Sequence, residues 1–141
     1  AAMVGCGDAV EIRVMEPTAL FVSHGSPMTA LQGGAAGAFT SGSITHNLGW
    51  FMHDPQPMQA PVRAESAAFR QWWQAHSVAS DWPALCAYRT LAPHGVDMHP
   101  TDEHLLPFFV AAGWGVALGR RASRVHESAQ HGVIGMDAYA F

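Results

Sequence analysis

The sequence predicts an α/β domain in which a central sheet is flanked by helices. Residues 19–22 form an unbroken apolar run, typical of a short strand that is buried on both faces. Residues 61–76 place Phe69 and Trp73 at helical spacing against a polar face, and residues 132–141 read as an apolar final strand. With 141 residues, 49% of them hydrophobic, the chain is long enough for one domain with its own core.

Two strands are expected near the N-terminus. Residues 10–14 alternate apolar and charged side chains, as an edge or half-buried strand does. The apolar strand 19–22 then runs into a Ser-His-Gly-Ser-Pro turn. Gly25 permits a tight turn and Pro27 stiffens its exit, so we expect His24 at the rim of the sheet, where open α/β sheets bind ligands. The alternative is a loop histidine that only caps or hydrogen-bonds its own turn.

A second histidine follows a run of small side chains. Residues 31–39 are rich in glycine and alanine and predict at most a frayed helix that ends near Thr40. Small or hydroxylated residues then lead to His46, and no apolar strand precedes it. Either His46 has a functional role, or His46 and Asn47 cap a helix. Residues 51–60 contain two prolines and predict a loop.

Two helices are expected between residues 61 and 88. Pro61 suits the first position of the amphipathic helix 61–76, and Arg70 belongs to its polar side. A second, short helix reaches Tyr88, with Pro83 in its first turn.

A further predicted helix carries a third histidine. Thr101 is a good N-cap for a helix that continues to residue 113, which places His104 in the first turn. Glu103 and the nearby His99 offer donors of the types that bind divalent metals, and a carboxylate beside His104 would fix its tautomer. The alternative is a solvent-exposed histidine in the first turn. Residues 120–126 then predict a polar connection to the final strand.

Composition argues against several classes of partner. The formal net charge is −4, and all seven basic residues are arginines without a long cluster, which argues against a nucleic-acid surface or a polybasic membrane patch. No apolar run reaches the ~20 residues of a membrane span, and the N-terminus lacks the order of a secretory signal. Cys6 and Cys86 are isolated, so we expect a cytoplasmic protein with a free, buried thiol at Cys86. Nine histidines favour a metal or proton-transfer site.

Four stretches carry a family resemblance. They are residues 20–28 (Leu-Phe-Val-Ser-His-Gly-Ser-Pro-Met), 42–48 (Gly-Ser-Ile-Thr-His-Asn-Leu), 99–107 (His-Pro-Thr-Asp-Glu-His-Leu-Leu-Pro) and 136–141 (Met-Asp-Ala-Tyr-Ala-Phe). In this order they resemble the DOPA-dioxygenase branch of the class III, LigB-type extradiol ring-cleavage dioxygenases. The similarity runs from about residue 18 to the last residue. We therefore expect residues 1–17 to be an N-terminal extension and residues 18–141 to form a single, shortened domain of this class.

The resemblance implies an enzyme that opens a catechol-type ring with O2 at a non-haem Fe(II), or at Zn in some members. His24 corresponds to the first metal ligand, and His104 corresponds to the histidine that closes the metal site. His46 corresponds to the histidine of a Thr-His-Asn-Leu motif, which is a ligand or the acid/base that takes the catechol proton. The implied metal set is therefore His24, His46 and His104, with His46 as the catalytic residue.

The chain also departs from this family. Its members are nearly twice as long, and the middle of their domain is missing here between Thr40 and Ser41. Their Ser-Ala-His-Trp segment, which supplies another metal ligand, and their Asp-His-Gly segment, which supplies a histidine near the substrate, are absent. His53, His94 or His99 are candidates to replace the lost ligand. Two alternatives therefore stay open: a catalytically incomplete metal-binding remnant, and a subunit that depends on a partner, including a homo-oligomer.

Overall fold

The computed structural model describes residues 19–23 and 39–141. Within these residues the main sheet has four strands, in the order β2 (Phe39–Gly42), β1 (Leu20–Ser23), β6 (Ala138–Ala140) and β3 (Ser123–His126). β1 is parallel to β2 and antiparallel to β6, and β6 is antiparallel to β3. A small second sheet pairs β4 (Ala129–Gln130) with β5 (Ile134–Gly135). The described chain is thus a mixed α/β structure, as the sequence predicts.

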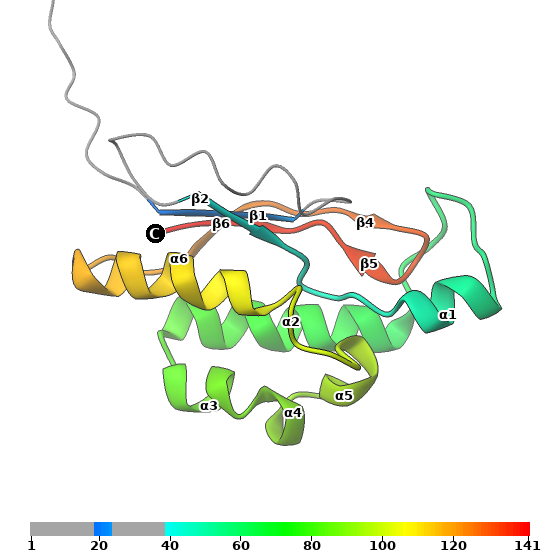
Figure 1. Ribbon diagram of the computed structural model, residues 1–141, viewed down its shortest axis with the longest axis horizontal. Helices are drawn as coiled ribbons and strands as arrows, with labels where there is room; N and C mark the ends of the chain where they lie inside the picture. Colours follow the sequence, from blue (N-terminus) through cyan, green and yellow to red (C-terminus); the bar gives the residue numbers. More distant parts are fainter. Residues whose placement is uncertain (1–18, 24–38) are drawn as a thin grey trace, which may run out of the picture.

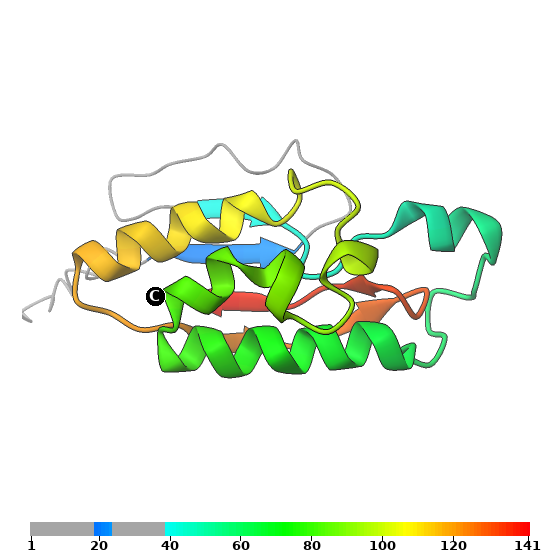
Figure 2. The same ribbon diagram turned by 90° about the horizontal axis from the view of Figure 1, so that it is seen from below.

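Six helices belong to the described residues. They are α1 (Leu48–His53), α2 (Ala64–Ala79), α3 (Trp82–Cys86), α4 (Tyr88–Leu91), α5 (Gly95–Met98) and α6 (Leu106–Ala117). Figures 1 and 2 show α2 and α6 beneath one face of the main sheet, with α3, α4 and α5 on the side of these helices that faces away from the sheet. None of the helices in the described part of the chain is long and apolar enough to cross a membrane.

The core lies between the sheet and these two long helices, around Phe108 of α6. Its ring meets Phe21 of β1 and Tyr139 of β6 edge-on, at centroid distances of 5.5 and 5.3 Å. Phe21 and Tyr139 are register partners in the sheet, so both side chains point to the helical face. Trp73 of α2 closes the cluster, with its ring centroid 5.1 Å from that of Phe108. Edge-on aromatic pairs of this kind fix the distance between α6, α2 and the sheet.

The predicted apolar strands are present. β1 covers the stretch expected at 19–22, shifted by one residue, and lies between two other strands. Its burial is less complete than predicted, because Phe21 is buried but Leu20 and Val22 are partly exposed. The final stretch, expected as one strand over residues 132–141, is instead divided into β5 and β6, which belong to different sheets, and β6 is internal as predicted. The strand expected at 10–14 lies outside the described residues.

Two strands differ from the prediction. β2 lies where the frayed helix was expected to end, and it supplies the strand that leads toward His46. Its sequence contains one large apolar side chain, and its pairing with β1 is a long-range contact, reinforced by a 3.0 Å hydrogen bond from Ser41 Oγ to the carbonyl of Val22. β3 occupies part of the expected connection at 120–126. It lies at an edge of the described sheet, where polar side chains are tolerated.

The helix predictions need corrections at their starts. α2 begins at Ala64 rather than at Pro61, because Arg63 is extended and donates its N–H to the carbonyl of Gly132 at 2.9 Å. The short helix is divided into α3 and α4. The first part of the expected loop at 51–60 belongs to α1, which is capped by the side chain of Asn47, as the capping alternative for that stretch predicts.

α6 begins at Leu106, later than predicted. The Thr101 hydroxyl donates to the carboxylate of Glu103 at 2.6 Å instead of capping a helix. His104 therefore lies just before the helix, in a segment of turns, and not in its first turn. A second correction concerns Cys86, which is exposed rather than buried.

Candidate histidine site

Two of the three predicted site histidines lie in contact. The rings of His46 and His104 are stacked, with 3.6 Å between their centroids and 18° between their planes. Both side chains are half-buried. His46 follows β2, and His104 precedes α6, so the fold brings together two motifs that are far apart in the sequence. We call this pair, together with the backbone that holds it, the histidine site.

Hydrogen bonds between the two motif segments position the pair. The N–H of Ser43 donates to the carbonyl of His104 at 2.7 Å, and the N–H of His46 donates to the carbonyl of Met98 at 2.9 Å. The side-chain amide of Asn47 donates to the carbonyl of Asp97 at 2.5 Å. The backbone of residues 43–47 is thus attached along the segment that leads to His104, which holds the two imidazoles face to face.

Gly42 allows this close approach. A Cβ at Gly42 would overlap the carbonyl oxygen of His104, so any larger residue would push the two segments apart. Gly42 is also the register partner of Ser23, the last residue of β1. Ser23 is held in turn by Asp137, whose carbonyl accepts from both its hydroxyl, at 2.7 Å, and its N–H, at 3.2 Å. The end of β1 therefore lies at the same sheet rim as the histidine site.

His24, the third predicted ligand, lies outside the described residues. The structure describes its preceding neighbour, Ser23, at the sheet rim, but not His24 itself. Within residues 19–23 and 39–141, no group of three or more histidine, cysteine, aspartate or glutamate side chains is arranged to hold a metal ion. The described residues thus supply two of the three predicted ligands.

His99, which we considered as a metal donor, has a different position. It is fully buried, and its Nε2 donates to the carbonyl of Ile44 at 2.7 Å. Among the described residues its Nδ1 has no hydrogen-bond partner, and the ring packs between Phe69 and Tyr88 at centroid distances of 5.6 and 6.0 Å. Burial lowers the pKa of His99 to about 4, so the imidazole is neutral at physiological pH. This side chain braces the segment in front of His46.

The acidic residues near His104 have other partners. A hydrogen bond from Thr101 holds the pKa of Glu103 below its usual value, and the nearby imidazoles of His104 and His46 contribute to this shift. Asp102 accepts a short hydrogen bond from the hydroxyl of Tyr88 and forms a 2.6 Å ion pair with Arg89. The Tyr88 hydrogen bond is the main reason that the pKa of Asp102 is lowered.

The other proposed replacement ligands lie away from the pair. His94 is exposed and faces Asp97 at 3.3 Å. His53 belongs to the last turn of α1 and is also exposed. Neither joins His46 and His104 in a metal-binding group.

Sequence reasoning missed a buried ion pair. Arg70, which we placed on the polar side of its helix, is almost fully buried and makes a two-pronged contact with Asp137 of 2.7 and 2.8 Å. Asp137 is 1% exposed. The sequence did contain a signal for this pair, because Asp137 is a charged residue inside the otherwise apolar stretch 132–141. A carboxylate that is buried in such a strand requires a positively charged or hydrogen-bonding partner.

Comparisons with known proteins give a partial similarity. No protein-family model matches the chain. A segment of 77 residues, 54% of this chain, is 32% identical to 4,5-DOPA dioxygenase extradiol of Portulaca grandiflora. The matched region covers 28% of that relative's length. The similarity therefore suggests a distant relation to the LigB-type extradiol dioxygenases, over about half of this chain and about a quarter of the relative.

Proposed function

We propose that this chain carries the metal centre of an extradiol dioxygenase that opens a catechol-type ring with O2. The observation that supports the proposal is the stacked pair of His46 and His104, which lies at the sheet rim where β1 ends just before His24. The partial similarity to a DOPA dioxygenase agrees with this chemistry.

The donor chemistry of the pair suits a non-haem metal. Imidazole nitrogens are common ligands of both Fe(II) and Zn, and a third donor from His24 would complete a set of three. A bound iron ion would bring the catechol oxygens and O2 together. The hydrogen bonds from the N–H of Ser43 to the carbonyl of His104 and from the N–H of His46 to the carbonyl of Met98 hold the backbone of the two histidines together before any metal binds.

His46 has the second role in this proposal. An imidazole is the side chain best suited to take a proton near neutral pH, and a catechol must lose a proton before its ring is opened. The N–H of His46 is fixed to the carbonyl of Met98, so its backbone is held while the ring remains half-buried. His24 and His104 would hold the metal, and His46 would be either the third ligand or the base that receives the catechol proton.

The experiment that tests the proposal measures metal stoichiometry after anaerobic loading with Fe(II) and, separately, with Zn(II). The purified chain is compared with His24→Ala and His104→Ala, and His126→Ala serves as the control because this exposed side chain contacts Ser128. We expect nearly one metal per chain, lost in both site variants and kept in the control. The iron-loaded chain should then consume O2 with a catechol and form a yellow ring-opened product.

Two results would contradict the proposal. If all four proteins bind metal equally, or if none of them binds metal, the chain has no metal centre formed by His24 and His104. Stoichiometric binding of Zn or Fe with no turnover of any catechol would instead identify the chain as a metal-binding remnant of the family.

A second candidate function is a subunit that works as a dimer with another copy of this chain. The exposed side of α6 carries an apolar stripe at helical spacing, 43–61% exposed, formed by Leu106, Val110, Trp114 and Leu118. No charged residue occurs in α6, so a second copy of the helix would cover the stripe without burying an unpaired charge. Light scattering across a concentration series tests this candidate, because a monomer at all concentrations would exclude it.

A further inference from the structure

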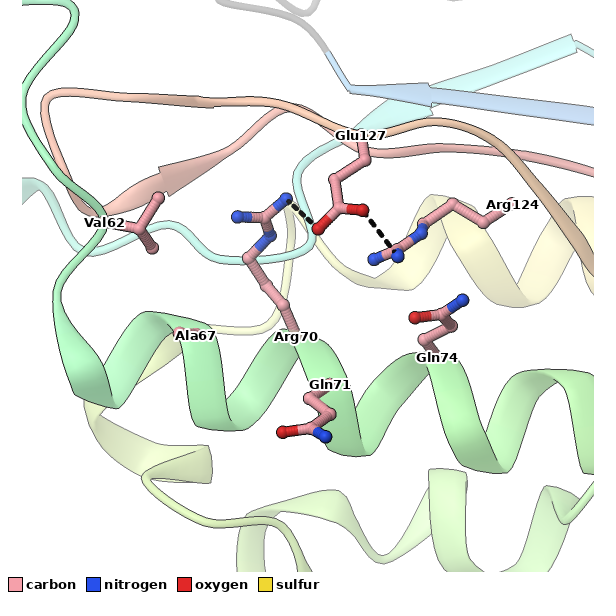
Figure 3. Close-up of a pocket in the computed structure, with 7 residues that line it drawn as sticks. All are labelled: Val62, Ala67, Arg70, Gln71, Gln74, Arg124 and Glu127. Carbon is pink, nitrogen blue, oxygen red and sulfur yellow. Dashed lines mark ion pairs between the residues drawn. The ribbon is translucent and has the colours of Figure 1, made fainter.

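A separate pocket lies between α2 and the end of β3. Its volume is about 310 Å³, and its lining side chains come from α2, from the residue pair Arg124 and Glu127, and from Val62. Figure 3 shows the side chain of Arg70 reaching from α2 to Glu127, which lies between Arg70 and Arg124. The pocket shares no lining residue with the histidine site and is independent of the proposed dioxygenase function.

Arg70 lines the pocket, and its guanidinium group is held in place by hydrogen bonds. Its Nε and Nη2 are held by the buried carboxylate of Asp137, and Nη2 also donates to the carbonyl of Ser128 at 3.0 Å. Burial by itself would lower the pKa of Arg70, but the hydrogen bond and charge of Asp137 outweigh it and raise the pKa. In the described part of the chain, no hydrogen bond uses Nη1 of Arg70, which Figure 3 shows turned toward Val62.

Arg124, the second cation of the pocket, is paired with Glu127, whose side chain is exposed to solvent. Asp137 lies 2.7 Å from the guanidinium of Arg70 and 3.7 Å from that of Arg124, and Glu127 supplies the second negative charge that balances the two cations. The Glu127 carboxylate lies 2.6 Å from Arg124 and 3.7 Å from Arg70, and its side chain is 57% exposed. An ion pair with such an exposed partner contributes little to stability, so another carboxylate can replace that of Glu127 at low cost.

The remaining lining groups favour an organic carboxylate over a simple ion. Gln71 and Gln74 present side-chain amides that make no hydrogen bond within the described residues, so they are available to a ligand. Val62 and Ala67 add apolar surface to the same pocket. Guanidinium groups bind carboxylates through paired hydrogen bonds, and the apolar lining suits a hydrocarbon body.

We propose that this pocket binds a small organic molecule with a carboxylate head and an apolar body. The ligand carboxylate takes the place of the Glu127 carboxylate against Arg124 and Arg70, and the apolar body lies against Val62 and Ala67. Glu127 thus covers the site when no ligand is bound and leaves it when a ligand binds.

Benzoate is the probe for this proposal, and benzamide is its matched neutral control. Isothermal titration calorimetry is carried out on the full chain and on Glu127→Gln and Arg124→Gln. We expect saturable binding of benzoate but not of benzamide. Glu127→Gln should tighten benzoate binding about threefold or more because the competing carboxylate is gone, and Arg124→Gln should weaken it about tenfold or more.

Two variants control for net charge. Glu65→Gln removes an acidic charge from the first turn of α2, and Arg121→Gln removes an exposed arginine near Arg124 but outside the pocket lining. Both should bind benzoate as the unmodified chain does. If Arg124→Gln fails to fold, the exposed Glu127→Gln substitution still decides the question. The proposal is overturned if benzoate does not bind in saturable fashion, or if Glu127→Gln tightens binding no more than Glu65→Gln does.

Discussion

The buried imidazole of His99 donates a 2.7 Å hydrogen bond to the carbonyl of Ile44, a residue 55 positions earlier in the chain. This bond joins the same two segments whose backbone contacts hold His46 against His104. His99 is not part of the stacked pair, but its hydrogen bond to Ile44 helps to keep His46 and His104 in their positions.

His99 should make the stability of the protein depend on pH. Its pKa is about 4 in the folded chain, against an ordinary value of 6.5 that applies after unfolding. Burial is the main cause of the lowered pKa, and the charges of His46 and His104 add to it, whereas the hydrogen bond to Ile44 and the charge of Asp102 oppose it. The unfolded chain thus binds more protons between pH 4 and 6.5, so this contribution is complete above pH 6.5 and is lost as the pH falls toward 4, by roughly 3 kcal/mol.

Urea unfolding at a series of pH values between 4 and 7.5 measures this effect. The control is His99→Gln, which keeps an N–H donor for the carbonyl of Ile44 but cannot titrate. The slope of stability against pH in this range should be smaller in His99→Gln. Equal slopes in the two proteins would mean that His99 is not the group responsible.

Gly42→Ala should disturb the histidine site. The added Cβ would overlap the carbonyl oxygen of His104, which is backbone and must move, at a cost of about 1–3 kcal/mol. Gly113→Ala is the matched control, because a Cβ there meets nothing within 4 Å and alanine favours a helix by about 0.5–1 kcal/mol over glycine. Thermal unfolding and metal titration are compared for the two variants. Equal Tm values would show that the contact between Gly42 and His104 is not tight.

Asp137→Asn should be strongly destabilising. It leaves Arg70 buried without its charged partner, which costs about 3–5 kcal/mol. Arg63→Gln breaks an exposed ion pair, the 3.5 Å contact with Asp54, and should change stability by less than about 1 kcal/mol. Chemical denaturation of both variants separates the two cases. A loss below 1 kcal/mol in Asp137→Asn would show that water reaches Arg70.

Val110→Glu tests the apolar stripe of α6. Val110 is 61% exposed, so a charge at this position is tolerated in a monomer but not in an interface between two copies. If the chain forms the proposed dimer, the substitution should shift it to monomer in analytical ultracentrifugation, with an unchanged circular dichroism spectrum. Val125→Glu, at a 58% exposed position on β3, is the control and should leave the oligomeric state unchanged.

The parts of the fold that could be predicted from sequence are those specified by local pattern. The apolar residues around Phe21 and Tyr139 identify the two internal strands, and the spacing of Phe69 and Trp73 identifies the longest helix. β2 could not be predicted in this way, because Ser41 and its neighbours carry little apolar signal and form a strand through pairing with β1.

The sequence singles out His46 and His104 as candidates, but it does not predict how their side chains are arranged. His46 and His104 follow from their motifs, whereas their stacking depends on hydrogen bonds between segments that are distant in sequence. The start of α6 was placed too early because Thr101 has the composition of a cap, although its hydroxyl donates to Glu103. Helical spacing likewise placed Arg70 on the polar, exposed side of α2. Its side chain is instead buried, because it pairs with Asp137, the residue just before β6.

The register of β2 has a consequence for how the chain tolerates added sequence. Thr40 and Ser41, between which the sequence resemblance implies a missing segment, are adjacent residues of one strand, paired with Phe21 and Val22 of β1. In this chain the junction is therefore not a loop that can be lengthened freely. A few glycines and serines inserted there would interrupt the strand and move His46 away from His104, whereas the same insertion near Gln56, between α1 and α2, would leave the sheet intact.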